Sequence, residues 1–215
     1  MDVAKFQALA PAIDWKVVLT GYSVGDIKRI VVGEPSALTE TAKLIANEPI
    51  DAWKTYLTFG TARSASQYLT KAFDDARFEF YGKTLQGMET KRERWKRGIA
   101  LVNSRIGEGA GEIYVQKYFP PENKAKMDAL VTNLLAALRT RIEKLDWMDE
   151  PTRAEALKKL GTFEPRVGYP KTFRDYSALQ IDRGKLFENI LAAQHFDWAR
   201  QVKRLGGKVD RNEWG

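Results

Sequence analysis

The sequence contains no cysteine and only one histidine among its 215 residues. Without cysteine there are no disulfides, no thiolate nucleophile and no metal site built on thiolates. A hydrolytic zinc site usually takes three protein ligands, often two histidines one helical turn apart, which this chain cannot supply. A Ser-His-Asp triad would also have to use His195, and no serine stands in a glycine-flanked turn. His195 borders an apolar helix stripe, which favours a satisfied or partly buried structural histidine.

Long apolar runs are missing as well. No window approaches the roughly 20 apolar residues of a membrane span, and the first 15 residues lack the apolar stretch of a signal peptide. We therefore expect no membrane segment in this chain. The formal charge of +7, from 35 basic and 28 acidic residues, permits an anionic partner without requiring one.

What the sequence does contain is helical periodicity. Apolar residues recur at steps of three and four from Pro35 onward, which predicts a mainly α fold of five or six amphipathic helices. We expect one helical domain over residues 1–215, in which residues 1–33 are irregular and the β-branched run "IKRIVVG" forms at most a short strand or hairpin. The expected helices cover residues 35–48, 50–87 with a weak point at Gly60, 95–119, 127–145, 150–161 and 182–204.

Several motifs suggest chemistry only at first sight. "GEGAG", residues 107–111, follows a helical pattern and lacks the Lys-Ser/Thr of a phosphate loop, so close helix packing or a bend explains it better. Two carboxylate pairs, Asp74 with Asp75 and Glu122 with Asp128, could act as acid and base, but spacing alone does not show a perturbed pKa.

The densest basic cluster is "KRERWKR". A tryptophan among cations is typical of surfaces that contact phosphates and stack on bases. On a helix, however, Trp95 shares a stripe with Ile99 and Val102, so we expect the ring to point inward and the cations to face solvent. The pattern therefore favours a solvated helix face over a nucleic-acid surface. The alternative function is a free-standing binding module whose basic face consists of Lys91, Arg92, Arg94, Lys96 and Arg97.

The most organised stretch is "LDWMDEPTRAEALKKLGTFEPRVGYP", residues 145–170. Asp149, with Pro151 in the first turn, can cap a helix that ends at Gly161, and Thr152 with Glu155 is a second candidate cap. We expect Trp147 and Met148 to close the preceding helix against the core. "FEPRVGYP" should then run extended, because residues before proline avoid the helical region.

This stretch resembles the neprilysin-like family of zinc metalloendopeptidases, which includes neprilysin, the endothelin-converting enzymes and bacterial oligopeptidases. The matching elements are "LDWMDEPTRAEALKKL", "VGYP" and "FRDYSAL", preceded by "ERWKRG" and "IGEGAGEIYV" and followed by "VDRNEW". Together they cover about residues 30–214. Animal members commonly have cysteine where this chain has Gly98, so the chain looks more like a bacterial member.

The resemblance implies a helical lid domain that faces the catalytic domain across a chamber admitting small peptides. In the family, the zinc-binding His-Glu-x-x-His helix and the substrate-binding strand follow the "VDRNEW" segment, so we expect a truncated chain that is inactive alone. No residue is assigned as catalytic, cofactor-binding or metal-binding, and zinc is expected only in the full-length parent. The expected partners are the parent's catalytic domain and small peptides, and the parent's implied location is periplasmic or secreted.

A third reading is a chain that works beside a separately supplied catalytic half, which requires an exposed apolar face.

Overall fold

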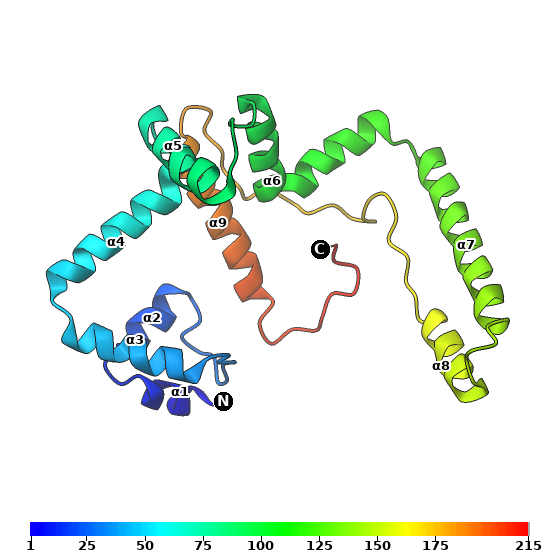
Figure 1. Ribbon diagram of the computed structural model, residues 1–215, viewed down its shortest axis with the longest axis horizontal. Coiled ribbons are helices and arrows are strands. Elements are labelled where there is room, and N and C mark those ends of the chain that lie inside the picture. The colour runs from blue at the N-terminus through cyan, green and yellow to red at the C-terminus, as the bar shows by residue number, and fades with distance from the viewer. Residues whose placement is uncertain (215) are drawn as a thin grey trace. The chain divides into compact units, whose positions relative to one another are not determined.

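The computed structural model describes residues 1–214, and helix dominates them: this range holds nine α-helices, one 3₁₀ turn and one π-helix, without a strand. The expectation of a mainly α fold is confirmed. The chain divides into two compact units, whose helices are labelled in Figure 1. Unit 1 comprises residues 1–91 and 181–207, and unit 2 comprises residues 92–180 together with the residues from Lys208 onward.

Most helices belong to unit 1. They are α1 (Val3–Leu9), α2 (Trp15–Gly21), α3 (Pro35–Asn47), α4 (Ile50–Ala65), α5 (Lys71–Arg77), the π-helix (Phe78–Thr84) and α9 (Leu186–Lys203). Unit 2 holds α6 (Arg94–Tyr118), α7 (Pro121–Glu143) and α8 (Glu150–Leu160).

Residues 1–33, which we expected to be irregular, contain the two short helices α1 and α2. Asp14 starts α2 by accepting a hydrogen bond from the Val17 amide at 3.1 Å. The rings of Phe6 and Trp15 lie 4.3 Å apart and join the two helices. The "IKRIVVG" run makes one antiparallel bridge, between Asp2 and Arg29, and does not extend into a strand.

The predicted helix over residues 50–87 is broken, but not at Gly60, which lies inside α4. The break is the 3₁₀ turn Ser66–Tyr68, where the Ser66 hydroxyl donates to the Arg63 carbonyl at 2.7 Å. A serine that bonds the backbone in this way competes with the helical ladder, and an extended Leu69 then ends the helix.

The last helix begins at Leu186 and not near Asp182, so the proposed Asp182 cap is wrong. Asp182 belongs to a turn, where its main chain exchanges two hydrogen bonds with the Asn189 side chain, at 2.9 and 2.7 Å. Ile190 and Ala193 of α9 are buried. The Trp198 indole donates to the Tyr22 carbonyl at 2.8 Å and is 44% exposed.

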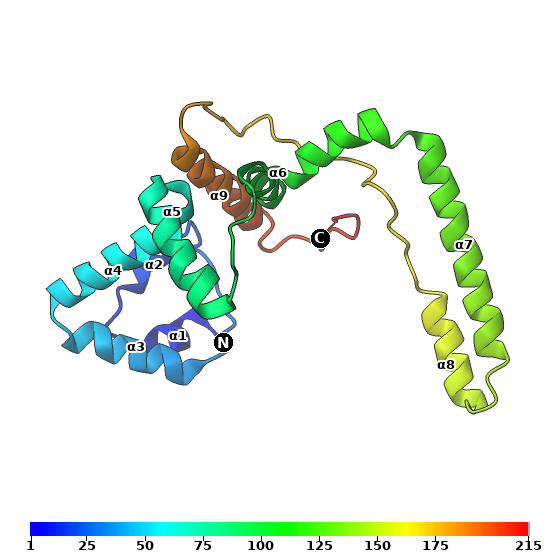
Figure 2. The ribbon, with the colours of Figure 1, turned by 45° about the horizontal axis from the view of Figure 1, so that its top comes forward.

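Unit 2 is built on a kinked helix and a helical hairpin. α6 bends at Ile106, whose φ of −134° and ψ of 36° are not helical, directly before the first glycine of "GEGAG". α7 and α8 lie side by side and run in opposite directions (Figure 2). The predicted bend at the glycine motif is therefore present.

The apolar stripes of unit 2 are largely uncovered. No residue of α6 or α7 is buried. The predicted core stripe of α7 exposes Met127 by 39%, Leu130 by 49%, Leu134 by 59% and Leu138 by 41%. The whole chain exposes 16914 Å², whereas two separate globular proteins of half its mass would together expose about 12,000 Å². Much apolar surface that the sequence pattern assigns to a core thus faces solvent.

Candidate functional site

The α7–α8 corner shows how the organised stretch works. Asp149 caps α8 by accepting a hydrogen bond from the Thr152 amide at 2.9 Å, so Asp149 is the cap and Thr152 is not. Hydrogen bonding with the Thr152 side chain, and then with the Thr152 amide, holds the pKa of Asp149 below its usual value. The Arg153 guanidinium turns back to donate to the carbonyls of Leu145, at 2.7 Å, and Met148, at 2.9 Å. One arginine therefore satisfies the last carbonyls before α8.

The tryptophan of this corner contradicts the sequence interpretation. Trp147 is 74% exposed and does not close α7 against a core. The half-buried Met148 contributes its carbonyl to Arg153. The corner is thus held by hydrogen bonds from a charged side chain to main-chain carbonyls, and its aromatic ring faces solvent.

After α8 the chain runs as a long irregular segment, residues 162–179, which we call the strap. Its first part runs along α7, where the Lys124 ammonium donates to the Val167 carbonyl at 2.9 Å. Gly168 follows with a φ of +76°, and a Cβ atom there would lie 2.8 Å from the ring of Phe119. "VGYP" therefore needs glycine for both backbone conformation and space.

The second part of the strap is anchored on α6. The Glu108 carboxylate accepts from the Arg174 amide at 2.6 Å and lies 3.6 Å from the guanidinium of the same residue. The Tyr176 ring lies 3.2 Å from where a Cβ on Gly109 would stand. "GEGAG" thus admits a tyrosine ring and supplies a carboxylate; the close contact is with the strap and not with another helix, as one of the two expectations for this motif had it.

A third anchor joins the strap to the end of the described chain. The Arg166 guanidinium donates to the main-chain carbonyls of Arg211 and Glu213. Both carbonyls belong to the "VDRNEW" motif, so this pair of bonds links two separate sequence motifs within unit 2.

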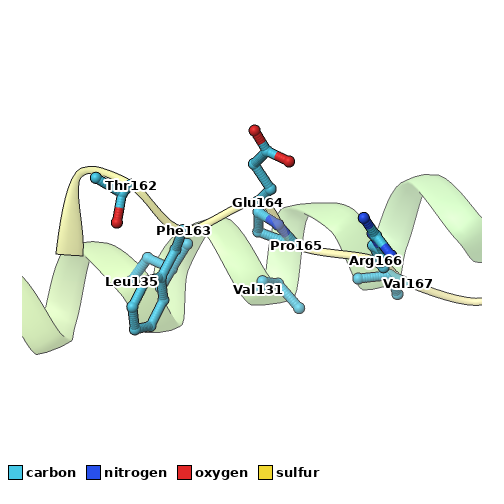
Figure 3. Close-up of a pocket in the computed structure, with 8 residues that line it drawn as sticks. All are labelled: Val131, Leu135, Thr162, Phe163, Glu164, Pro165, Arg166 and Val167. Carbon is cyan, nitrogen blue, oxygen red and sulfur yellow. The ribbon is translucent and has the colours of Figure 1, made fainter. Parts of the chain in front are cut away.

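Between the strap and α7 lies a groove of about 540 Å³, lined by Val131, Leu135, Thr162, Phe163, Glu164, Pro165, Arg166 and Val167. Figure 3 shows the strap running along the helix, with Phe163 beside Leu135 and the Glu164 carboxylate pointing away from α7. The floor is aliphatic and aromatic, which suits an apolar ligand group and not a charged one.

The basic cluster agrees with the prediction at Arg92 and Arg94, which are exposed, but not at Lys91 and Trp95. Trp95 is 60% exposed, whereas Lys91 is a half-buried residue whose ammonium contacts Asp74 at 2.8 Å and Asp75 at 2.6 Å. Lys96 pairs with Glu93 at 3.3 Å. The expected inward tryptophan and solvated lysines are therefore wrong, because Lys91 neutralises two carboxylates that α5 presents together.

Three of the four candidate acid/base carboxylates, Asp74, Asp75 and Asp128, are ion-paired. Hydrogen bonds from Lys71 and Lys91 lower the pKa of Asp75 to about 2, which keeps this carboxylate ionised at neutral pH. Burial disfavours the charged form of Lys91, but its bonds to Asp74 and Asp75 outweigh burial and raise its pKa. Asp128 pairs with Lys124 at 3.3 Å. None of these contacts suits a group that must exchange protons near pH 7.

His195 is exposed on α9 and not partly buried as expected. Within residues 1–214 no three His, Cys, Asp or Glu side chains are placed to hold a metal ion. No described helix is both long and apolar enough to cross a membrane.

Sequence reasoning missed Glu108, Arg153 and Arg166, although each lies inside a motif that we quoted. A charged residue in the middle of an otherwise structural motif was the available signal. Their partners are main-chain groups 5 to 66 positions away in the sequence, as for Met148 with Arg153 and Arg174 with Glu108, and spacing does not reveal such contacts.

The order of these motifs has counterparts in known proteins. A family model described as peptidase family M13 matches residues 1–170. The chain belongs to peptidase family M13. M13 enzymes are zinc metallopeptidases, so the neprilysin-like resemblance seen in the motifs is confirmed.

Similar M13 proteins are much longer than this chain. An endothelin-converting enzyme homolog of Locusta migratoria is 26% identical over all of this chain and 32% of its own length, and Neprilysin-3 of Drosophila melanogaster is 25% identical over all of this chain and 30% of its own length. The cryo-EM structure of Mycobacterium tuberculosis zinc metalloprotease Zmp1 in its open state matches all of this chain and 33% of that chain, with 39% identity and a TM-score of 0.87. PepO from Lactobacillus rhamnosis HN001, with 24% identity, a TM-score of 0.80 and coverage of 97% of this chain and 34% of that one, is alike in fold. The chain thus spans about a third of these relatives.

Proposed function

We propose that this chain is a non-catalytic, lid-forming part of a bacterial-type M13 zinc metallopeptidase that cleaves small peptides. The observation that carries the proposal is that the motif residues make structural contacts. Glu108, Arg153 and Arg166 hold main-chain segments, and Gly109 and Gly168 make room for rings. These residues hold the chain in shape, and the polar groups of the three charged ones are used in structural hydrogen bonds.

In this proposal the two compact units belong to one helical domain of the parent, and the parent's zinc site lies outside this chain. The lid contributes by shape, because a closed chamber excludes bulk water and large substrates. The uncovered stripes of α6 and α7 support a role beside further protein, since an exposed apolar face of this kind marks an interaction surface.

Peptide hydrolysis tests the proposal. We expect the purified 215-residue chain not to cleave a quenched-fluorescent peptide with or without added zinc. The full-length parent should cleave the same peptide until a chelator is added. Chelator-sensitive hydrolysis by the chain alone would refute the non-catalytic role, and a full-length parent without peptidase activity would refute the assignment to a working enzyme.

The nucleic-acid-binding alternative loses its main support, because Lys91 and Lys96 of the basic cluster pair with carboxylates. An electrophoretic mobility shift at low salt separates the two functions. We expect no shift, whereas binding that weakens steeply as salt rises would favour the binding module.

A further inference from the structure

The two edges of the strap beside α7 differ in their main-chain hydrogen bonding. In an extended segment, the N–H and C=O of one residue point to one edge and those of the next residue point to the other. Phe163, Pro165 and Val167 share an edge that is partly occupied: the Phe163 amide donates to the Leu160 carbonyl at 3.3 Å, Pro165 has no N–H, and the Val167 carbonyl accepts from Lys124 and from the Tyr169 amide.

The opposite edge is open. Across the described residues, no hydrogen bond uses the main-chain N–H or C=O of Glu164 or Arg166. Two neighbouring residues of this edge therefore offer two donors and two acceptors, which is the pattern that an added β-strand pairs with. The strap is also fixed at both ends, by Lys124 at Val167 and by the turn after α8, so pairing requires little further ordering.

The side chains specify what could pair there. Alternate residues of a strand added at this edge would lie over the groove, whose floor is formed by Val131, Leu135 and Phe163. The residues between them would face outward beside Glu164, whose exposed carboxylate has no ion-pair partner within residues 1–214. Arg166, by contrast, is committed to the carbonyls of Arg211 and Glu213. The surface therefore complements alternating apolar and basic residues.

We propose that the Glu164–Arg166 edge and the groove beside it bind an extended peptide with an apolar-basic-apolar pattern, by strand addition. The choice of a peptide as ligand rests on the proposed peptidase function. The site would hold part of a substrate away from the catalytic centre, so it would affect which peptides the parent prefers and would not affect bond cleavage itself.

The probe is a fluorescent pentapeptide, valine-lysine-valine-serine-valine, blocked at both ends and titrated into the full 215-residue chain while anisotropy is followed. We expect saturable binding. Methylating the peptide nitrogens that face the strap should weaken binding about tenfold, since each pairing bond is lost, whereas methylating those that face away should not. These two peptides have the same composition, so the comparison is independent of protein stability.

A charge exchange tests the role of Glu164 without disturbing the floor. Compared with the wild-type chain, the variant Glu164→Lys should bind the lysine peptide more weakly. It should bind more tightly a second peptide in which glutamate replaces that lysine. Absence of saturable binding, equal binding of the two methylated peptides, or the same peptide preference in both proteins would each overturn the proposal. Because none of these measurements involves hydrolysis, their failure would leave the proposed peptidase role standing.

Discussion

At the scale of single residues, Gly168 shows why the "VGYP" motif contains a glycine. Its φ of +76° is a conformation that only glycine adopts without strain, and its missing side chain leaves room for Phe119. Gly206 has nearly the same φ, +74°, but an added Cβ there would meet nothing within 4 Å. The two glycines therefore separate backbone strain from crowding.

We predict that Gly206→Ala lowers the free energy of unfolding by about 1 kcal/mol and that Gly168→Ala lowers it by at least about 2 kcal/mol. The difference reflects the contact at 2.8 Å with the Phe119 ring. Urea unfolding followed by circular dichroism measures both. Equal losses would show that Phe119 moves aside without cost.

The ion cluster around Lys91 predicts a pH dependence. Because the pKa of Asp75 is lowered from 3.8 to about 2, its ionised form stabilises the fold above pH 3.8, and this contribution is lost as the pH falls toward 2. Wild type should therefore be more stable than Asp75→Asn at pH 7, and the difference should disappear between pH 4 and 2. Asp51→Asn, at a carboxylate that is 86% exposed, is the control. A constant difference over this range would contradict the assignment.

At the scale of elements, the α7–α8 hairpin depends on Arg153. The variant Arg153→Ala leaves the carbonyls of Leu145 and Met148 without their donor, and we predict a loss of about 2 kcal/mol in the free energy of unfolding. Arg153→Lys keeps the charge but loses the planar fork, so we expect a loss of about 1 kcal/mol. Denaturant unfolding of the two variants measures both losses. An Arg153→Ala variant as stable as wild type would show that water takes over the hydrogen bonds to the two carbonyls.

Helices could be predicted from the sequence because caps and periodicity are local. Asp149 as the cap of α8, Pro35 at the start of α3 and the bend at "GEGAG" all depend on residues a few positions apart. The 3₁₀ turn at Ser66 and the late start of α9 were missed, because a serine hydroxyl and an asparagine side chain there compete with the helical pattern.

The candidate site was less predictable than the helices. Residues 163–170 were expected to run extended, but the groove of the strap depends on residues 30 positions apart in the sequence, such as Leu135 and Pro165. The orientation of Trp95 was wrong because periodicity identifies an apolar face but does not say whether anything covers it. Burial depends on tertiary partners, and within residues 1–214 no partner buries the stripes of α6 and α7.

At the scale of the whole molecule, the uncovered apolar stripes predict that the native chain binds apolar molecules on its surface. A dye that fluoresces on apolar surfaces should bind the native chain strongly, at sites that include the α7 stripe of Met127, Leu130, Leu134 and Leu138. Replacing Leu130 and Leu134 by glutamine should reduce the dye signal without lowering stability, because both side chains are about half exposed or more. Dye binding no stronger than that of an ordinary globular protein would show that these stripes are covered in solution.

Trp95 and Trp147 also give the chain an optical property. Both indoles are mainly in water, with exposures of 60% and 74%, and an excited indole emits at longer wavelength where water can reorient around it. Protein that covers either ring would shift the emission toward the blue. Trp95 and Trp147 are therefore intrinsic fluorescent probes on surfaces where we expect further protein to bind. The rate of that binding can be measured by stopped-flow fluorescence without attaching a label.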